Sequence, residues 1–277
     1  MQTKISAKAP VIGGRQYHIA LKEGDVARYV LTPGDPERVG KIASLWDSAH
    51  EVAFHREYHT MTGIYKGVDL SCVSTGMGAP SYLIGVDELS RIGVDTFIRV
   101  GTCGGIQKNQ QLGDLVISTG AVRFDGASRD LVVPEYPAVA DYEVVMALIQ
   151  AAEEFKFRYH VGITASFDTF YTGQGRPALN NYLPSSKEHI LKDMTMANVQ
   201  NFEMEVSSLL TFTNIFGKRG GAVCVIIANR LTDEFELTEE YERRSGLVAS
   251  RAVTILAGWD EKKKKSGKRF LYPGMLQ

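Results

Sequence analysis

An apolar run that ends in glycines occupies residues 95–106 and restricts the local structure to a buried strand. Phe97, Ile98 and Val100 favour a strand on an enclosed, pleated surface. The glycines that follow allow the backbone to turn and allow another group to approach it closely. We therefore expect a buried strand that runs directly into a glycine-rich turn at residues 101–105.

Arg99 interrupts this apolar strand with a charge that it cannot lose, so its guanidinium needs an anionic partner. One interpretation is an ion pair with a carboxylate of the protein. The other is an oxyanion such as phosphate, which matches the donor fork of arginine and which the glycines and the hydroxyl of Thr102 favour. This stretch by itself does not distinguish between the two partners.

Strand and helix patterns alternate along most of the chain, without a low-complexity linker or an internal repeat. The alternation predicts an α/β fold, with a single domain over residues 1–277 whose mixed, largely parallel central sheet is flanked by helices. We expect residues 1–14 to form a flexible arm. The last helix is expected to begin after Thr238 and to end near Trp259, which leaves residues 260–277 as a solvated, charged tail.

The remaining elements follow from hydrophobic periodicity and from capping residues. Expected helices cover 80–91, 141–155 and 201–217, and expected strands cover 26–31, 58–65, 68–75, 115–118, 160–166 and 222–228. Residues 123–137 are expected to be irregular, and residues 181–200 are expected to form a loop with one short helix. The polar residues singled out below fall mostly where strands end, which is where α/β folds bind ligands.

The composition excludes several classes of function. The formal net charge is −1, from 31 basic and 32 acidic residues, so no positive excess indicates a nucleic acid partner. Without an apolar run of about 18 residues or a secretory start, we expect neither a membrane span nor export. Cys72, Cys103 and Cys224 fit no zinc spacing and indicate buried thiols in a reducing cytoplasm. A nucleophilic Cys103 is the less favoured alternative, because no histidine is paired with it.

Residues 32–39 supply a second pattern for anion binding, in which a turn at Gly34 leads into a helix that starts at Asp35. Unpaired N–H groups at a helix start can bind an anion, and Arg38 lies one turn further on. The alternative is an ordinary helix cap with a surface arginine. Arg56 alone would be interpreted as a solvated charge, but arginines from separate segments repel each other unless an anion lies between them.

Two further groups of residues indicate a sugar site and a base site. Glu203 and Glu205 flank Met204, so two carboxylates could bind sugar hydroxyls while the thioether contacts the apolar face of the sugar. The alternative is a pair of acids favoured by the dipole at a helix start. In the loop 168–177, an amide, a guanidinium and an aromatic ring could bind the edge and face of a flat heterocycle, although an ordinary polar loop is the alternative.

Sites for phosphate, a sugar and a heterocycle together indicate a nucleoside phosphorylase. Five segments resemble those of the hexameric nucleoside phosphorylase family: 32–38, 55–57, 74–78, 99–102 and 201–205. The resemblance extends over about residues 17–254, and segments 168–176 and 229–230 are similar to those of uridine-cleaving members. It implies reversible phosphorolysis of uridine to uracil and ribose 1-phosphate, with deoxyuridine and thymidine as further candidate substrates.

The resemblance also implies roles for individual residues, position by position. The implied phosphate-binding residues are Gly34, Arg38, Arg56, Arg99 and Thr102. The implied ribose-binding residues are His18, Glu203, Met204 and Glu205. The implied base-binding residues are Phe170, Gln174, Arg176 and Arg230. The implied catalytic residues are Arg176, Arg230 and Glu205, and Glu57 matches a residue associated with a monovalent cation in some members.

Further expectations concern assembly and chemistry. The resemblance implies a homo-oligomer, a hexamer built from dimers, in which Arg56 and His18 serve a neighbouring subunit. Phosphate is the expected co-substrate, and no cofactor is expected beyond a monovalent cation. The alternatives are a purine nucleoside phosphorylase, a nucleosidase of the same fold and a non-catalytic nucleoside-binding protein. Arg230 favours a pyrimidine because purine-cleaving relatives have an aspartate nearby, and the retained phosphate-site arginines argue against a nucleosidase.

Overall fold

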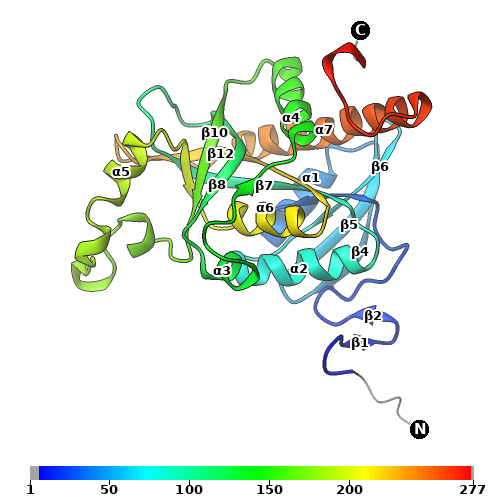
Figure 1. Ribbon diagram of the computed structural model, residues 1–277, viewed down its shortest axis with the longest axis horizontal. Coiled ribbons are helices and arrows are strands. Elements are labelled where there is room, and N and C mark those ends of the chain that lie inside the picture. Colours follow the sequence, from blue (N-terminus) through cyan, green and yellow to red (C-terminus); the bar gives the residue numbers. More distant parts are fainter. Residues whose placement is uncertain (1–5, 276–277) are drawn as a thin grey trace.

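The computed structural model describes residues 6–275, and an 11-stranded mixed sheet forms its centre (Figure 1). The sheet contains β3 (Tyr29–Thr32), β4 (Ser48–His55), β5 (Tyr58–Tyr65), β6 (Val68–Val73), β7 (Thr96–Gly105), β8 (Leu115–Arg123), β9 (Ala138–Val139), β10 (Tyr159–Ser166), β11 (Asn201–Glu203), β12 (Arg219–Asn229) and β13 (Glu234–Phe235). The helices are α1 (Pro36–Ala43), α2 (Ala79–Arg91), α3 (Gly126–Leu131), α4 (Tyr142–Phe155), α5 (Ile190–Met196), α6 (Val206–Ile215) and α7 (Glu239–Ser266). The mixed α/β architecture expected from the sequence is confirmed.

Five strands of the sheet close into a ring. β7 pairs with β12, β12 with β8, β8 with β10, β10 with β11, and β11 again with β7. β7 is parallel to β12 and to β3, whereas its pairing with β11 is antiparallel. The antiparallel strands β4, β5 and β6 extend the sheet beyond β3. This topology makes β7 the common neighbour of β3, β11 and β12, which all carry polar residues singled out from the sequence.

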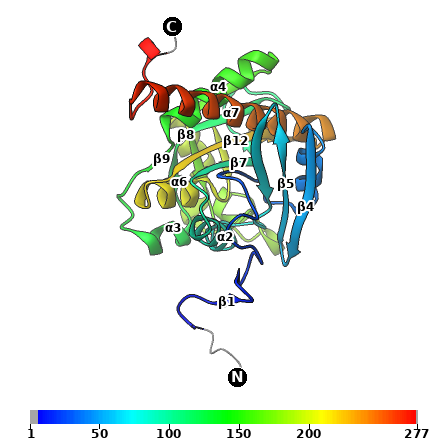
Figure 2. The same ribbon diagram turned by 90° about the vertical axis from the view of Figure 1, so that its right-hand side faces the viewer.

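Helices cover both faces of the sheet. α4 and α7 pack on one face, and α2, α3 and α6 pack together on the other (Figures 1 and 2). The main hydrophobic core fills the space between these layers and includes Phe97, Val100, Leu148, Leu209 and Val253. Alternation of buried strands with amphipathic helices therefore produces the layered arrangement that the sequence pattern predicts.

Helix starts follow the capping residues seen in the sequence. The Asp141 carboxylate accepts the N–H groups of Glu143 and Val144 and caps α4, and Asp35 accepts the N–H of Glu37 at the start of α1. Side-chain acceptors at these positions satisfy backbone donors that the first helical turn leaves unpaired. The expected hairpin of β5 and β6 is also present, with positive φ at Lys66 and Gly67 in its turn.

The expectation of a glycine turn after Val100 is wrong, because β7 continues as a strand to Gly105. The parallel partner β12 provides backbone hydrogen bonds along this whole stretch, so no turn is required. The glycines instead allow close packing: a Cβ at Gly101 would lie 2.7 Å from Sγ of Cys224, and one at Gly105 would lie 2.7 Å from Oε1 of Gln110. Residues 101–105 therefore form one wall of the ring.

The solvated tail expected at residues 260–277 needs correction in part, because α7 extends to Ser266 although most residues from 261 to 270 are exposed. Asp260 pairs with Arg219 at 2.8 Å, and Lys263 pairs with Glu143 at 2.5 Å, so charged residues after Trp259 attach the helix to the sheet and to α4. Residues 276–277 lie outside the described residues.

Three smaller expectations need correction. Residues 201–203 form β11 rather than the first turn of a helix, because they complete the ring between β10 and β7. The stretch expected to be irregular contains α3, whose N-cap is Asp125. The expected arm at residues 1–14 contains β1 (Val11–Ile12), which pairs with β2 (Arg15–Gln16), and residues 1–5 lie outside the described residues. Within residues 6–275, each helix is too short or too polar to cross a bilayer.

Candidate active site

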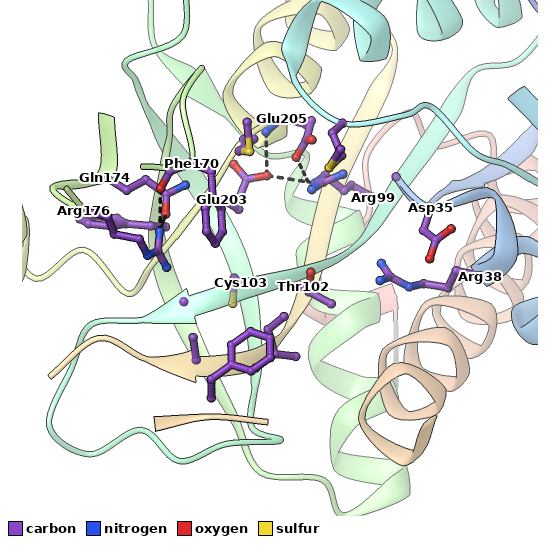
Figure 3. Close-up of a pocket in the computed structure, with 18 residues that line it drawn as sticks. Asp35, Arg38, Arg99, Thr102, Cys103, Phe170, Gln174, Arg176, Glu203 and Glu205 are labelled. Carbon is purple, nitrogen blue, oxygen red and sulfur yellow. Dashed lines mark hydrogen bonds and ion pairs between the residues drawn. The ribbon is translucent and has the colours of Figure 1, made fainter. Parts of the chain in front are cut away.

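A cavity of about 240 Å³ lies beside β7 and collects most of the residues singled out from the sequence. The predicted site residues that line it are Gly34, Arg38, Arg99, Thr102, Phe170, Gln174, Arg176, Glu203, Met204 and Glu205. Figure 3 shows Arg38 and Asp35 at one end, Gln174, Phe170 and Arg176 at the other, and Arg99 with the two glutamates between them. The cavity thus has a cationic end, an acidic middle and an end that combines an aromatic ring with an amide and a guanidinium.

Arg99 is the buried cation at the centre of the cavity. Its Nε donates to Oε2 of Glu203 at 3.0 Å, and its Nη2 donates to Glu205. Burial opposes the charge of the guanidinium, but the carboxylates of Glu205 and Glu203 outweigh it and raise the pKa of Arg99. Of the two partners considered from the sequence, the carboxylate is the one present here. Nη1 of Arg99 is buried and has no hydrogen-bond partner among the described residues, so one donor remains for another acceptor.

Glu203 and Glu205 occupy the junction between β11 and α6. Both oxygens of Glu203 accept the N–H of Val206, and Oε2 also accepts the N–H of Glu205, so this carboxylate satisfies donors at the start of α6. Oε1 of Glu205 accepts the N–H of Gly78 at 2.6 Å. Burial, reinforced by the charge of Glu203 and opposed by Arg99, raises the pKa of Glu205 to about 7. Glu205 therefore changes its protonation state near neutral pH.

Arg38 projects from α1 toward the cationic end of the cavity. Its Nε and Nη2 both lie 3.0 Å from Oε1 of Glu242, a residue in the first turn of α7. Lys41 donates to the other oxygen of the same carboxylate at 2.8 Å. The expected repulsion between the arginines is thus offset by protein carboxylates, Glu242 for Arg38 and two glutamates for Arg99. Sequence reasoning missed Glu242, because its partners are about 200 positions away in the chain.

The other end of the cavity is formed mainly by the loop after β10, and the residue after β12 contacts this loop from outside the lining. Nη1 of Arg176 donates to Oε1 of Gln174 at 2.5 Å and to the carbonyl of Phe170 at 2.8 Å. The Arg176 guanidinium carbon lies 4.1 Å from the centroid of the Phe170 ring. Arg230 lies outside the cavity lining but donates to the carbonyl oxygen of Gln174 at 3.2 Å. Burial and the nearby charge of Arg230 lower the pKa of Arg176 to about 10.

His18 and Arg56 do not line this cavity, and they lie together elsewhere on the chain. Arg56 donates to the hydroxyl of Tyr17 at 3.2 Å, and the rings of Tyr17 and His18 pack edge to face at 4.7 Å. Nδ1 of His18 lies 2.7 Å from Oε1 of Glu88. The two residues that the resemblance assigns to a neighbouring subunit therefore form one cluster.

Glu57 also lies outside the cavity lining. Its carboxylate accepts the hydroxyl of Ser81 at 2.7 Å, and this hydrogen bond is the main cause of its lowered pKa. Among residues 6–275, no three His, Cys, Asp or Glu side chains are grouped in a way that could hold a metal ion. The role of Glu57 toward a monovalent cation stays a prediction.

Several lining residues were not predicted as parts of the site. They are Asp35, Met77, Cys103, Gly104, Phe202, Ile227, Ala228 and Phe235. The sequence around Met77 could have indicated its place in the site, because a large apolar residue between two glycines is untypical of a strand or helix interior. Its side chain is 86% exposed. Phe235 follows β12 by several residues and gave no comparable pattern, because only the folded loop brings its ring to the cavity.

Comparisons with known proteins identify sequence relatives over most of the chain. The model of the phosphorylase superfamily matches residues 28–258. A uridine phosphorylase of Thermococcus kodakarensis is 58% identical over 98% of this chain and 98% of its own. The uridine phosphorylase of Escherichia coli strain K12 is 40% identical, covering 87% of this chain and 94% of its own. A guanosine phosphorylase of Halorubrum lacusprofundi is also 40% identical, over 78% of this chain and 84% of its own.

Proposed function

The chain belongs to the phosphorylase superfamily, and from this premise we propose that it cleaves uridine by reversible phosphorolysis. The observation that carries the proposal is the single cavity in which a cationic end, an acidic middle and a ring-and-amide end follow one another. That order matches inorganic phosphate next to the ribose and base of a nucleoside. Relatives named uridine phosphorylase support the same reaction.

In the proposed reaction, an oxygen of phosphate attacks C1′ of the ribose while the bond between C1′ and the base nitrogen breaks. The electron pair of that bond leaves with uracil, which then takes up a proton. Arg38, Arg99 and Thr102 would hold the phosphate, mainly lowering the barrier by orientation. The unpaired Nη1 of Arg99 supplies a buried donor for a phosphate oxygen. No covalent bond to the protein is needed.

The glutamates would bind the ribose. Glu205 is the residue proposed for the 2′-hydroxyl, with Met204 beside the sugar and Glu203 holding the junction of β11 and α6. When phosphate reaches Arg99, the cation is shared between the phosphate and these carboxylates. This arrangement would keep the acidic groups from repelling the incoming phosphate.

Gln174, Arg176 and Arg230 would stabilise the negative charge on the departing uracil, and Phe170 would stack on its face. Since Arg176 holds Oε1 of Gln174, the amide N–H groups of Gln174 point away from that bond and can donate to a uracil oxygen. A base end that offers donors favours a base with carbonyl oxygens. Tolerance for deoxyuridine and thymidine is part of the same proposal.

A complete site would require a second copy of the chain. His18 and Arg56 do not line the cavity of their own chain, so we propose that they serve a neighbour in a homo-oligomer, a hexamer built from dimers.

A monovalent cation at Glu57 and a cytoplasmic location also belong to this proposal. The free, buried cysteines are compatible with a reducing compartment.

The deciding experiment measures free uracil released from uridine with and without inorganic phosphate. Phosphate-dependent release, with ribose 1-phosphate as the second product, is expected. Release that ignores phosphate would indicate a nucleosidase instead. Guanosine and inosine belong in the same assay because one relative is named guanosine phosphorylase. Preferential cleavage of guanosine would replace uridine as the substrate, and no release from any nucleoside would indicate a binding role.

A further inference from the structure

Arg38 separates the candidate active site from a second cavity. This second cavity is about 210 Å³ and lies between α1 and the first turn of α7, where Lys41, Glu239 and Glu242 line it together with Arg38. Arg38 thus lines both cavities. A residue that holds the Arg38 guanidinium from the side of the second cavity therefore also determines which of its N–H groups face the candidate active site.

Glu242 is the residue that fixes it. Its side chain is only 6% exposed, its Oε1 accepts from Nε of Arg38 at 3.0 Å, and Nη2 of Arg38 lies 3.0 Å from the same oxygen. Its Oε2 accepts from Nζ of Lys41 at 2.8 Å. Arg38 and Lys41 are three positions apart on α1, so both side chains reach the same carboxylate. Glu242 therefore occupies the Nε edge of the guanidinium, while Nη1 on the opposite side donates to the carbonyl of Val100 at a longer distance of 3.5 Å.

The charges explain why this arrangement is compatible with binding an anion. Burial opposes the charge of Glu242, but hydrogen bonds and charges of Lys41 and Arg38 outweigh it and hold its pKa below the ordinary value. The carboxylate therefore stays ionised at neutral pH. Two cations and one anion leave this group with a net charge of +1, counted over Arg38, Lys41 and Glu242. Because Asp35 also lines the cavity at this end, binding of phosphate depends on where the Arg38 guanidinium points and not on the net charge alone.

We propose that Glu242 is a positioning residue for phosphate binding, which orients Arg38 so that its remaining donors face the cationic end of the cavity. The inference rests on the proposed function, because it takes phosphate as the ligand of Arg38. A purely electrostatic view predicts the opposite sign: a carboxylate next to Arg38 weakens the attraction for phosphate, so its removal would strengthen binding. The two views are therefore separable by one measurement.

The test compares Glu242→Asp and Glu242→Gln with the wild type in uridine phosphorolysis. Glu242→Asp keeps the charge but shortens the side chain by one methylene, so it cannot bridge Arg38 and Lys41 at the observed distances. We expect KM for phosphate to rise about tenfold in both variants, because orientation of the guanidinium is lost. KM for uridine should change less than about twofold, since Glu242 does not line the substrate cavity.

Glu239→Gln is the matched control. Glu239 lies in the same helical turn and lines the same second cavity, but it makes no hydrogen bond to Arg38 in the described part of the chain. Its variant loses the same charge and should leave KM for phosphate unchanged or slightly lower. A KM for phosphate in Glu242→Gln that is equal to or below the wild-type value would overturn the proposal. An equal rise in Glu239→Gln would overturn it as well.

A second readout separates this inference from the proposed reaction. Inorganic phosphate alone should raise the melting temperature of the wild-type protein and raise that of Glu242→Asp clearly less. If the wild type binds phosphate but does not cleave uridine, the proposed reaction fails while Glu242 is still tested. If the wild type does not bind phosphate at all, the inference fails too. Circular dichroism confirms that each variant is folded before its KM is interpreted.

Discussion

At the scale of single residues, buried charges decide what the cavity can do. Arg99 is 5% exposed and Glu205 is 3% exposed, yet both carry ionisable groups beside Glu203. Hydrogen bonds and ion pairs among the three side chains offset the cost of burying their charges. Burial, to which the second carboxylate adds, nevertheless raises the pKa of Glu205. The raised pKa of Glu205 is the basis of the first prediction.

The stability of the protein should depend on the protonation of Glu205. Its pKa is about 7 when folded, against an ordinary value of 4.5, so between these values the folded state binds more protons than the unfolded state. The free energy of unfolding should therefore fall as pH rises through this window and level off above it. Glu205→Gln should remove this part of the slope. Urea denaturation at a series of pH values measures it, with Glu188→Gln at an exposed site as the control. Equal slopes in wild type and Glu205→Gln would contradict the assignment.

The second prediction at the scale of single residues concerns Arg176. It holds Gln174, lies over the ring of Phe170 and lines the base end of the cavity. Arg176→Ala should reduce kcat/KM for uridine about 100-fold to 1,000-fold, the range seen when one donor to a developing negative charge is removed. Arg158→Ala is the control, because Arg158 is half exposed and pairs with Asp114 away from the cavity. Near wild-type turnover by Arg176→Ala would exclude it from the site.

At the scale of elements, β7 combines the roles of a core strand and a cavity wall. Its first half contributes Phe97, Ile98 and Val100 to the main core. Its second half is rich in glycine, so neighbouring side chains and β12 approach its backbone closely. Thr102 and Cys103 from this half line the cavity. The glycines therefore serve packing rather than turn formation.

Two glycine substitutions of opposite effect test this interpretation. Gly101→Ala would place a Cβ 2.7 Å from Sγ of Cys224 and 3.3 Å from Nη2 of Arg99, and we expect a loss of about 1–3 kcal/mol from overpacking. Gly258→Ala in the exposed face of α7 meets no atom within 4 Å and should stabilise the protein by about 0.5–1 kcal/mol. Urea denaturation measures both. A neutral Gly101→Ala would show that the glycine is not required for packing.

At the scale of the whole molecule, α7 ties distant parts of the chain together. Its first turn contacts α1 through Glu242, and its last turns contact the start of β12 and α4 through Asp260 and Lys263. Asp260 also accepts the hydroxyl of Tyr29 at 2.6 Å, which joins β3 to the same group. Burial opposes the charge of Asp260, but Arg219 and Tyr29 outweigh it and lower its pKa to about 2. The C-terminal helix is thus part of the fold.

Asp260→Asn should destabilise the protein by about 3 kcal/mol at neutral pH, because it leaves the partly buried Arg219 without its main partner. A depressed pKa means that this contribution is fully present above the ordinary value of 3.8 and is lost as pH falls toward about 2. The difference between wild type and variant should therefore shrink in acid. Melting temperatures across this range measure it. Glu261→Gln, at the exposed neighbouring position, is the control and should leave the melting temperature unchanged. If Asp260→Asn also leaves the melting temperature unchanged, residues 260–277 are better interpreted as a solvated tail.

Several helices were predictable because their starts and apolar faces depend on local patterns, whereas the candidate site residues followed from a resemblance of short segments to a known family. Asp141 caps a helix through its own side chain, and the apolar spacing of 80–91 is visible without the fold. The end of α7 lies beyond the expected one because the charged residues after Trp259 continue the helix to Ser266. Gly267, with φ of 65° at the C-cap, was the available signal for the true end.

The alternation of strands and helices was thus determined by the sequence alone, since hydrophobic periodicity and capping act at short range. Which charge meets which was decided only by the tertiary structure. Arg99 could have paired with phosphate or with a carboxylate, and folding brings it to Glu203 and Glu205, more than 100 positions away. Arg38 likewise meets Glu242 only because α1 packs against α7. Ion pairs between distant segments form only when the fold brings those segments together, so no local sequence pattern predicts them.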